Sequence, residues 1–179
     1  MAAIDIIHKY YREGDELYAI LLSHSYAVAE KALDIAKNHP ELVINQAFVE
    51  EAALLHDIGI FLTDAPKIHC FGSYPYICHG YLGADLLRKE GWDKYALVCE
   101  RHTGTGLTLE NIIQNQLPLP HRAMTPETIE EKLVCFADKF FSKSKPGKEK
   151  SPDKICKSIE KYGADSVARW DELVKLFLG

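Results

Sequence analysis

One short stretch of the chain sets an imidazole and a carboxylate side by side, directly behind an apolar run. His56 and Asp57 follow Ala52–Leu55 and precede Ile58 and Gly59. The apolar run indicates a buried segment, and a buried charge without a partner costs several kcal/mol. Any fold of this chain therefore has to bring a partner to the His-Asp pair, and a metal ion would pair both groups at once.

Further residues of metal-binding type lie at the ends or on the inward faces of predicted helices: His24, His79, His102 and Asp138. A single histidine on an apolar stripe is more often a satisfied core residue than a ligand. Asp138 alone could equally cap its helix or pair with Lys139. Taken together, imidazole and carboxylate groups suit iron, manganese or zinc. The joint pattern therefore predicts a metal site without thiolate ligands.

Apolar residues recur at helical spacing through most of the chain. The helices that we expect cover Leu17 to Pro40, Asn45 to Gly59, 80–90, 93–102, Thr125 to Phe140, a short segment after Ser151, and 164–178. Asn45, Thr125 and Ser151 are the expected N-caps, and Gly59 is the expected C-cap. No segment shows a convincing strand alternation. The sequence therefore predicts an all-α fold, a bundle of about eight helices.

The length of 179 residues fits one domain over 1–179. We expect its motif-bearing core at about 20–142 and C-terminal helices at 151–178. Residues 60–78 and 107–124 carry the proline, glycine and polar residues of long loops. Residues 142–154 are rich in lysine. Such charge runs are usually solvated faces, and a basic rim for a polyanionic nucleotide is the alternative.

The amino-acid composition indicates which classes of binding partner and which cellular compartment suit this chain. The net charge of -5 argues against a surface built to bind a nucleic-acid polymer. The five cysteines are odd in number and show no C-x-x-C spacing, which favours a reducing, cytoplasmic setting. No apolar run approaches the roughly 18 residues of a membrane span. We therefore expect neither a signal peptide nor a membrane partner.

The order of these residues resembles the HD superfamily of metal-dependent phosphohydrolases. His24, the pair His56-Asp57 and Asp138 follow its three-part signature, and residues 56–59 match its HDIG variant letter for letter. The resemblance covers roughly residues 20–142. It implies that these four side chains hold one metal ion.

In members with two metals, two more histidines stand between the pair and the distal aspartate, where this chain has His79 and His102. The resemblance then implies two divalent transition-metal ions, iron, manganese or zinc, with Asp57 bridging them. Asp57, His79 and His102 are the expected catalytic positions. A bridging carboxylate also makes physical sense, because in-line displacement at phosphorus favours two ions about 4 Å apart.

The implied reaction is hydrolysis of a small phosphate ester or anhydride by metal-activated water, on a nucleotide or a dinucleoside polyphosphate. Residues 101–104 are similar to the corresponding turn of enzymes that cleave dinucleoside tetraphosphates symmetrically. The backbone of Thr103 and Gly104 can present N–H groups to an anion, although an ordinary helix end is the alternative. Arg101, His121 and Lys139 are further candidates for phosphate binding, with solvated surface positions as the alternative.

Two other functions fit the same residues. In the first, the metal site belongs to a non-catalytic nucleotide sensor, and the 60–78 loop reports occupancy to a partner. In the second, the site is a di-iron oxygenase, a chemistry known in HD relatives. The ligand set is complete, so the enzyme interpretation leads.

Overall fold

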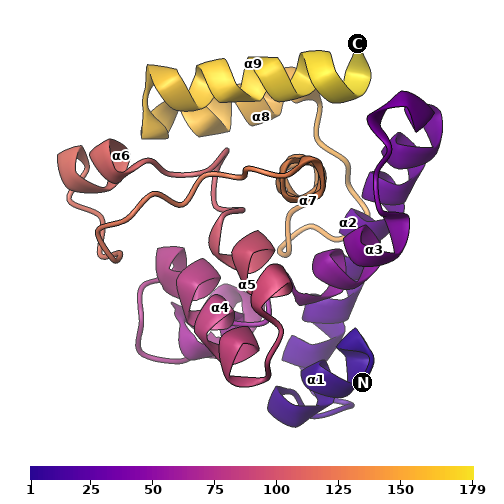
Figure 1. Ribbon diagram of the computed structural model, residues 1–179. Helices are drawn as coiled ribbons and strands as arrows, with labels where there is room; N and C mark the ends of the chain where they lie inside the picture. Colours follow the sequence, from indigo (N-terminus) through magenta and orange to yellow (C-terminus); the bar gives the residue numbers. More distant parts are fainter.

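The computed structural model describes residues 1–179 as nine α-helices with one two-stranded ladder (Figure 1). The helices are α1 (Ala3–Tyr10), α2 (Glu16–Asn38), α3 (Gln46–Leu55), α4 (His79–Lys89), α5 (Asp93–Glu100), α6 (Leu109–Gln114), α7 (Ile129–Asp138), α8 (Pro152–Ile159) and α9 (Ala164–Leu178). The all-α prediction is confirmed. The short helices α1 and α6 were not among the expected ones.

The long helix α2 runs beside α3 along one side of the molecule, and α8 and α9 lie together on another (Figure 1). In this view α7 is seen end-on near the middle, while α4 and α5 pack on the far side from α9. These helices therefore pack around α7 from different directions (Figure 1).

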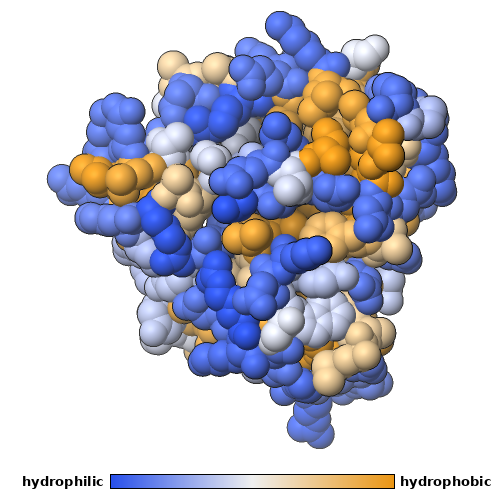
Figure 2. Space-filling model, viewed as in Figure 1, coloured by the Kyte–Doolittle hydropathy of each residue, from blue (hydrophilic) through white to orange (hydrophobic).

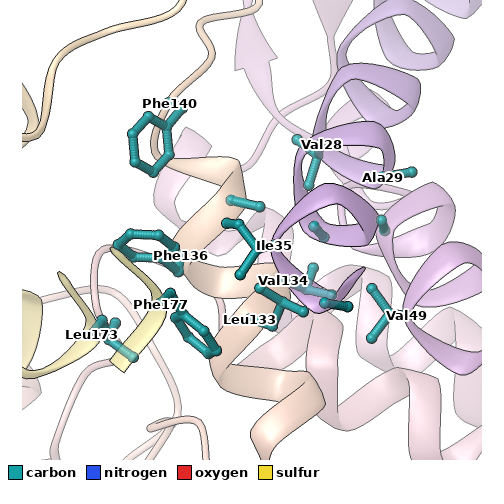
Figure 3. Packing of buried hydrophobic residues seen from close by; sticks show 14 of the residues in the cluster. Val28, Ala29, Ile35, Val49, Leu133, Val134, Phe136, Phe140, Leu173 and Phe177 are labelled. Carbon is teal, nitrogen blue, oxygen red and sulfur yellow. The ribbon is translucent and has the colours of Figure 1, made fainter. Parts of the chain in front are cut away.

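One hydrophobic cluster joins the second half of α2 to α3, α7, α8 and α9 (Figure 3). At its centre Phe136 of α7 stacks on Trp170 of α9, with 4.9 Å between ring centroids. Both are essentially fully buried. Burying a large apolar side chain contributes about 1.5–3 kcal/mol, so these rings fix α9 against α7.

A second cluster joins α1, the first half of α2, the end of α3, α4 and α5. Along α2 the boundary between the clusters falls between Leu21 and Val28, and along α3 it follows Ala53. His24 lies at the boundary on α2, whereas His56 and Asp57 stand between Leu55 and Ile58, which both belong to the second cluster. The His-Asp pair therefore lies beside the apolar residues of the second cluster.

Local capping signals are confirmed at two helix starts. The Asn45 side chain accepts a hydrogen bond from the Phe48 backbone N–H, 3.1 Å away, at the start of α3. The Ser151 side chain caps α8 by accepting from Lys154 N–H, and Pro152 occupies the first helical position. Each cap acts within one turn, which is why sequence alone located it.

The expected C-cap at Gly59 is wrong. Helix α3 ends at Leu55, and Gly59 has φ -84, outside the left-handed region that a glycine C-cap uses. Its lack of a side chain serves packing instead. A Cβ at position 59 would lie 2.4 Å from the carbonyl oxygen of His79 and 2.5 Å from the backbone nitrogen of Gly83. Gly59 thus lets the end of the HDIG motif touch α4.

The expected N-cap at Thr125 is also wrong, because α7 begins three residues later. Thr128 is the cap, and its side chain accepts a hydrogen bond from Glu131 N–H. Thr125 and Pro126 belong to the preceding segment, where the Met124 carbonyl accepts from Leu107 N–H at 2.9 Å. Residues 107 and 124 form an antiparallel β-bridge. Because the backbone of a bridge is extended, the helix starts only after this segment.

The 60–78 segment is mostly irregular, as expected, but it holds a two-residue ladder between β1 (Asp64–Ala65) and β2 (Cys70–Phe71). Hydrophilic side chains cover most of the face in Figure 2, with apolar groups gathered beside the C-terminal end of α9 and near α6. None of the nine helices has both the length and the apolar character needed to cross a bilayer.

Candidate metal centre

The carboxylate of Asp57 lies at the centre of the site, and its two oxygens face different histidines. Oδ2 lies 3.3 Å from Nε2 of His24 and 3.1 Å from Nε2 of His56. Oδ1 lies 3.2 Å from Nε2 of His79 and 3.3 Å from Nε2 of His102. Asp57 has no solvent-exposed surface. One buried carboxylate thus divides the histidines into two pairs.

Asp138 completes the group around Oδ2. Its Oδ1 is 2.8 Å from Nε2 of His24 and 3.2 Å from Nε2 of His56. His24 lies in the middle of α2, His56 directly follows α3, and Asp138 is the last residue of α7. The possible ligand atoms of these residues and Asp57 all lie within 4.8 Å of one another. This spacing is compatible with a single metal ion held among them.

The second group comprises Asp57, His79 and His102, again with ligand atoms within 4.8 Å of one another. His79 is the first residue of α4, and His102 lies two residues beyond the end of α5. Their Nε2 atoms are 3.0 Å apart. Two imidazole nitrogens at this distance need a shared cation or proton between them.

Backbone carbonyls set the orientation of three of the histidine rings. Nδ1 of His56, His79 and His102 each donates to the carbonyl oxygen three residues earlier in the chain, at 2.6 Å in all three cases. A carbonyl only accepts, so Nδ1 carries a proton, and in the neutral ring the Nε2 lone pair faces the centre. Metal-ligating histidines are typically oriented in this way.

The charged groups of the site strongly affect one another. Burial disfavours the charged form of His56, but Asp57 and Asp138 together raise its pKa to about 9. Burial lowers the pKa of His102 to about 4. Burial alone would raise the pKa of Asp57, yet the His56 and Lys143 cations hold it well below its usual range. A proton on His56 and the ammonium group of Lys143 thus balance the negative charge of the two carboxylates.

The buried carboxylate of Asp57 supports this interpretation. Both of its oxygens are buried, and neither accepts a hydrogen bond from a backbone group. A full cation, the Lys143 ammonium, lies 2.7 Å from Oδ2. Four imidazoles and two carboxylates form a donor set suited to divalent transition metals. The cluster fits divalent metal binding.

The comparison with protein families agrees with this geometry. The HD domain family matches residues 21–142, which contain all six of the clustered residues. The chain belongs to the HD domain family. The family supports a metal-dependent, hydrolase-type function for this HD domain.

Three archaeal relatives are similar over most of the chain. An uncharacterized protein of Methanocaldococcus jannaschii is 35% identical over 144 residues, covering 79% of this chain and 76% of that protein. A protein of Thermoplasma volcanium named tRNA (cytidine(56)-2'-O)-methyltransferase is 33% identical over 178 residues, covering 98% of this chain and 46% of that protein. A protein of the same name from Picrophilus torridus is 35% identical, covering 75% of this chain and 38% of that protein.

This HD domain therefore spans less than half the length of the two named methyltransferases that it matches. No solved structure matches the chain.

A cavity of about 700 Å³ opens onto the metal centre of the HD domain. His79, His102 and Asp138 lie in its wall. Five lysines also line it, at positions 67, 139, 143, 150 and 161, against the single carboxylate of Asp138. The chain as a whole carries a charge of -5. The positive lining of this cavity is therefore a local feature that suits an anion.

Three of the five predicted substrate-binding residues line the cavity, and two do not. Thr103, Gly104 and Lys139 are in the wall, and Lys139 donates to the His102 carbonyl at 2.8 Å. Arg101 turns away to form an ion pair with Glu131 at 2.9 Å. His121 is exposed and lies outside the cavity wall. The structure thus groups only the first three with the metal centre.

Sequence reasoning missed two of the five lysines and the three aromatic residues Tyr76, Phe141 and Tyr162 of the cavity. Lys143 and Lys150 belong to the lysine-rich run, for which a basic rim of the substrate site was one of the two interpretations. Nothing in the sequence around Lys67 and Lys161 indicated that they line the site. Tyr76 stacks on His79 with 4.6 Å between ring centroids, and burial raises its pKa to about 12. Tyr162 lines the cavity from a segment beyond the HD match.

The buried cysteines near the site are packing residues. The thiol of Cys99 donates to the carbonyl of His56 at 3.0 Å. Cys135 donates to the carbonyl of His102 at 3.5 Å, and burial raises its pKa to about 11. Thiols with raised pKa values stay protonated, so they are poor nucleophiles.

Proposed function

We propose that the chain is a phosphohydrolase that cleaves a small phosphate ester or anhydride, a nucleotide or a dinucleoside polyphosphate, with two divalent ions. The observation that carries this proposal is the division of the Asp57 oxygens between two groups of ligands. A carboxylate that faces two sets of imidazoles can bridge two ions. When bound, such ions lower the pKa of a water molecule toward neutrality and neutralise charge on the phosphoryl oxygens.

The protein's own residues would orient the substrate beside these ligands. Lys139 and Lys143 are the cavity lysines nearest the carboxylates, since each forms an ion pair with Asp138 or Asp57. Their ammonium groups can donate hydrogen bonds to phosphate oxygens. Thr103 and Gly104 follow His102 in the chain and line the same part of the cavity. Positive charge at developing anionic oxygens favours the transition state of phosphoryl transfer.

A nucleotide is proposed as the substrate on the size and charge of the cavity. Two of the relatives are named as tRNA methyltransferases. The name describes proteins more than twice as long as the matched part, so methyl transfer is not carried over to this site. The cavity volume of about 700 Å³ falls within the usual size of a small-molecule site.

The test uses purified protein, stripped with a chelator and reloaded with Mn²⁺, Fe²⁺ or Zn²⁺. We expect at least one metal to restore hydrolysis within a panel of nucleoside mono-, di- and triphosphates, cyclic nucleotides and dinucleoside polyphosphates. The Asp57→Ala variant should lose both metal and turnover, because its carboxylate serves both groups of ligands. The Asp34→Ala variant removes an exposed carboxylate from α2 and should keep both.

Two results would overturn the proposal. The first is a metal-loaded protein that binds nucleotides but hydrolyses none of the panel, which would point to a sensor. The second is an Asp57→Ala protein with full metal content and full activity.

A further inference from the structure

The metal centre forms only part of the cavity wall, through His79, His102 and Asp138. Another part of this wall comes from residues 150–162, and Lys150, Ser158, Ile159, Lys161 and Tyr162 all line the cavity. These residues lie beyond the 21–142 segment that matches the HD family. The part of the chain that the family shares therefore supplies the candidate metal-binding residues, while a segment outside it supplies a further part of the cavity wall.

Tyr162 is the aromatic residue of this C-terminal wall, and it lies directly against the turn that follows His102. A Cβ on Gly104 would come within 3.2 Å of two ring carbons of Tyr162. Gly104 also has φ +59, a left-handed conformation that a glycine adopts without strain. The absence of a side chain at residue 104 thus lets the ring sit close to the second group of ligands.

Hydrogen bonds from α9 hold this wall in place. The Thr105 hydroxyl donates to the Ser166 carbonyl at 2.9 Å. The Arg169 guanidinium donates to the carbonyls of Thr105 and Gly106, at 3.3 and 2.9 Å. Thr105 and Ser166 are buried, which shields these bonds from water. The turn after His102 and the segment bearing Tyr162 are therefore tied to the same helix.

The two other aromatic residues that line the cavity already have packing partners. The Tyr76 ring stacks on His79, and Lys143 lies 5.7 Å from its centroid. Phe141 packs against the first hydrophobic cluster. The Tyr162 ring is half-buried and packs on one side against a small hydrophobic cluster that includes Leu107 and Ile112. The flexible ammonium of Lys161 lies 4.9 Å from the ring centroid. A planar ligand can displace a mobile lysine side chain, and the lysine then remains nearby to contact a phosphate.

We propose that Tyr162 makes the site prefer nucleotides over other phosphate esters by stacking on the nucleobase of the substrate, while the phosphate lies beside the metal-binding residues. This inference rests on the proposed nucleotide hydrolysis and adds how the base is bound. Every base has a π-face, so stacking of this kind tolerates different bases. Truncating an aromatic platform typically weakens binding by about tenfold or more per stacked base.

The test compares two ligands that share a phosphate and a ribose and differ only in the base: AMP and ribose 5-phosphate. Binding is measured by calorimetry on Mn²⁺-loaded protein, and hydrolysis by phosphate release. We expect wild type to bind AMP at least about tenfold more tightly than ribose 5-phosphate. Tyr162→Ala should abolish this difference, and Tyr162→Phe should keep it. Tyr26→Ala, which removes an exposed tyrosine on α2, is the matched control.

The steady-state pattern should separate a base-binding role from a structural one. For a nucleotide that is hydrolysed, Tyr162→Ala should raise KM and leave kcat nearly unchanged, because the metal-binding residues are intact. A Tyr162→Ala protein that retains the preference for AMP refutes the proposal, as does a wild type that shows no preference. Because binding is measured separately, a preference for AMP without phosphate release would count against the proposed hydrolysis alone.

Discussion

The glycine of the HDIG motif offers a sharp test of how the second group of ligands is positioned. We predict that Gly59→Ala displaces α4 and weakens metal binding by Asp57, His79 and His102. The new Cβ would lie 2.4 Å from the His79 carbonyl oxygen and 2.8 Å from the Gly83 Cα. Both neighbours are backbone atoms of one helix, so no side-chain rotation can relieve the contact.

The size of the effect follows from these distances. Non-bonded heavy atoms come to rest at about 3.5 Å, so the start of α4 must retreat by about 1 Å. Metal sites tolerate ligand displacements of only about 0.2 Å. His79 is the first residue of this helix, so we expect the second ion to be lost. Overpacking of this kind costs about 1–3 kcal/mol, or about 2–12 °C in Tm.

The assay measures metal ions per chain after equilibration with limiting Mn²⁺, together with Tm. Wild type should bind two ions, and Gly59→Ala should retain only the one held by His24, His56 and Asp138. Gly91→Ala is the matched control. It lies between α4 and α5 with φ +79 and nothing near its Cβ, so strain of about 1–2 kcal/mol destabilises it without moving His79.

A Gly59→Ala protein that binds two ions with wild-type affinity would refute this reasoning. The same holds if Gly91→Ala loses the second ion to an equal degree, because general destabilisation would then explain the loss.

Three further outcomes are expected. His102→Ala should lose the second ion and keep the first, as metal analysis of the dialysed protein would show; loss of both ions would contradict the division of ligands around Asp57. Chelation should lower Tm by about 5–11 °C, because an ion at 100 times its Kd stabilises a fold by about 2.7 kcal/mol; an unchanged Tm in differential scanning fluorimetry would argue against metal binding. Lys143→Met should raise the KM for a phosphorylated substrate about tenfold while metal content stays the same, because a charge-assisted hydrogen bond is lost; an unchanged KM would remove Lys143 from the substrate site.

Residue type and local spacing were enough to predict the helical fold and to select the six clustered residues. Helical periodicity reflects which face of a segment is buried, and caps such as Asn45 and Ser151 act on backbone groups within one turn. The HDIG motif has the same local character, because its four residues are consecutive. The structure brings the six residues together, and their roles as metal ligands stay a prediction.

Tertiary packing decided what depends on residues far apart in the chain. His24 and Asp138 are 114 positions apart, yet 2.8 Å separates their side chains. Arg101 stands beside His102 but turns toward Glu131, an orientation that its neighbours in sequence do not determine. The close packing of Gly59 against α4 is visible only in the structure. The same is true of the contact between Tyr162 and the turn at Gly104. Local sequence therefore determined which chemical groups this protein carries, whereas the packing of distant helices determined which of them meet in the cavity.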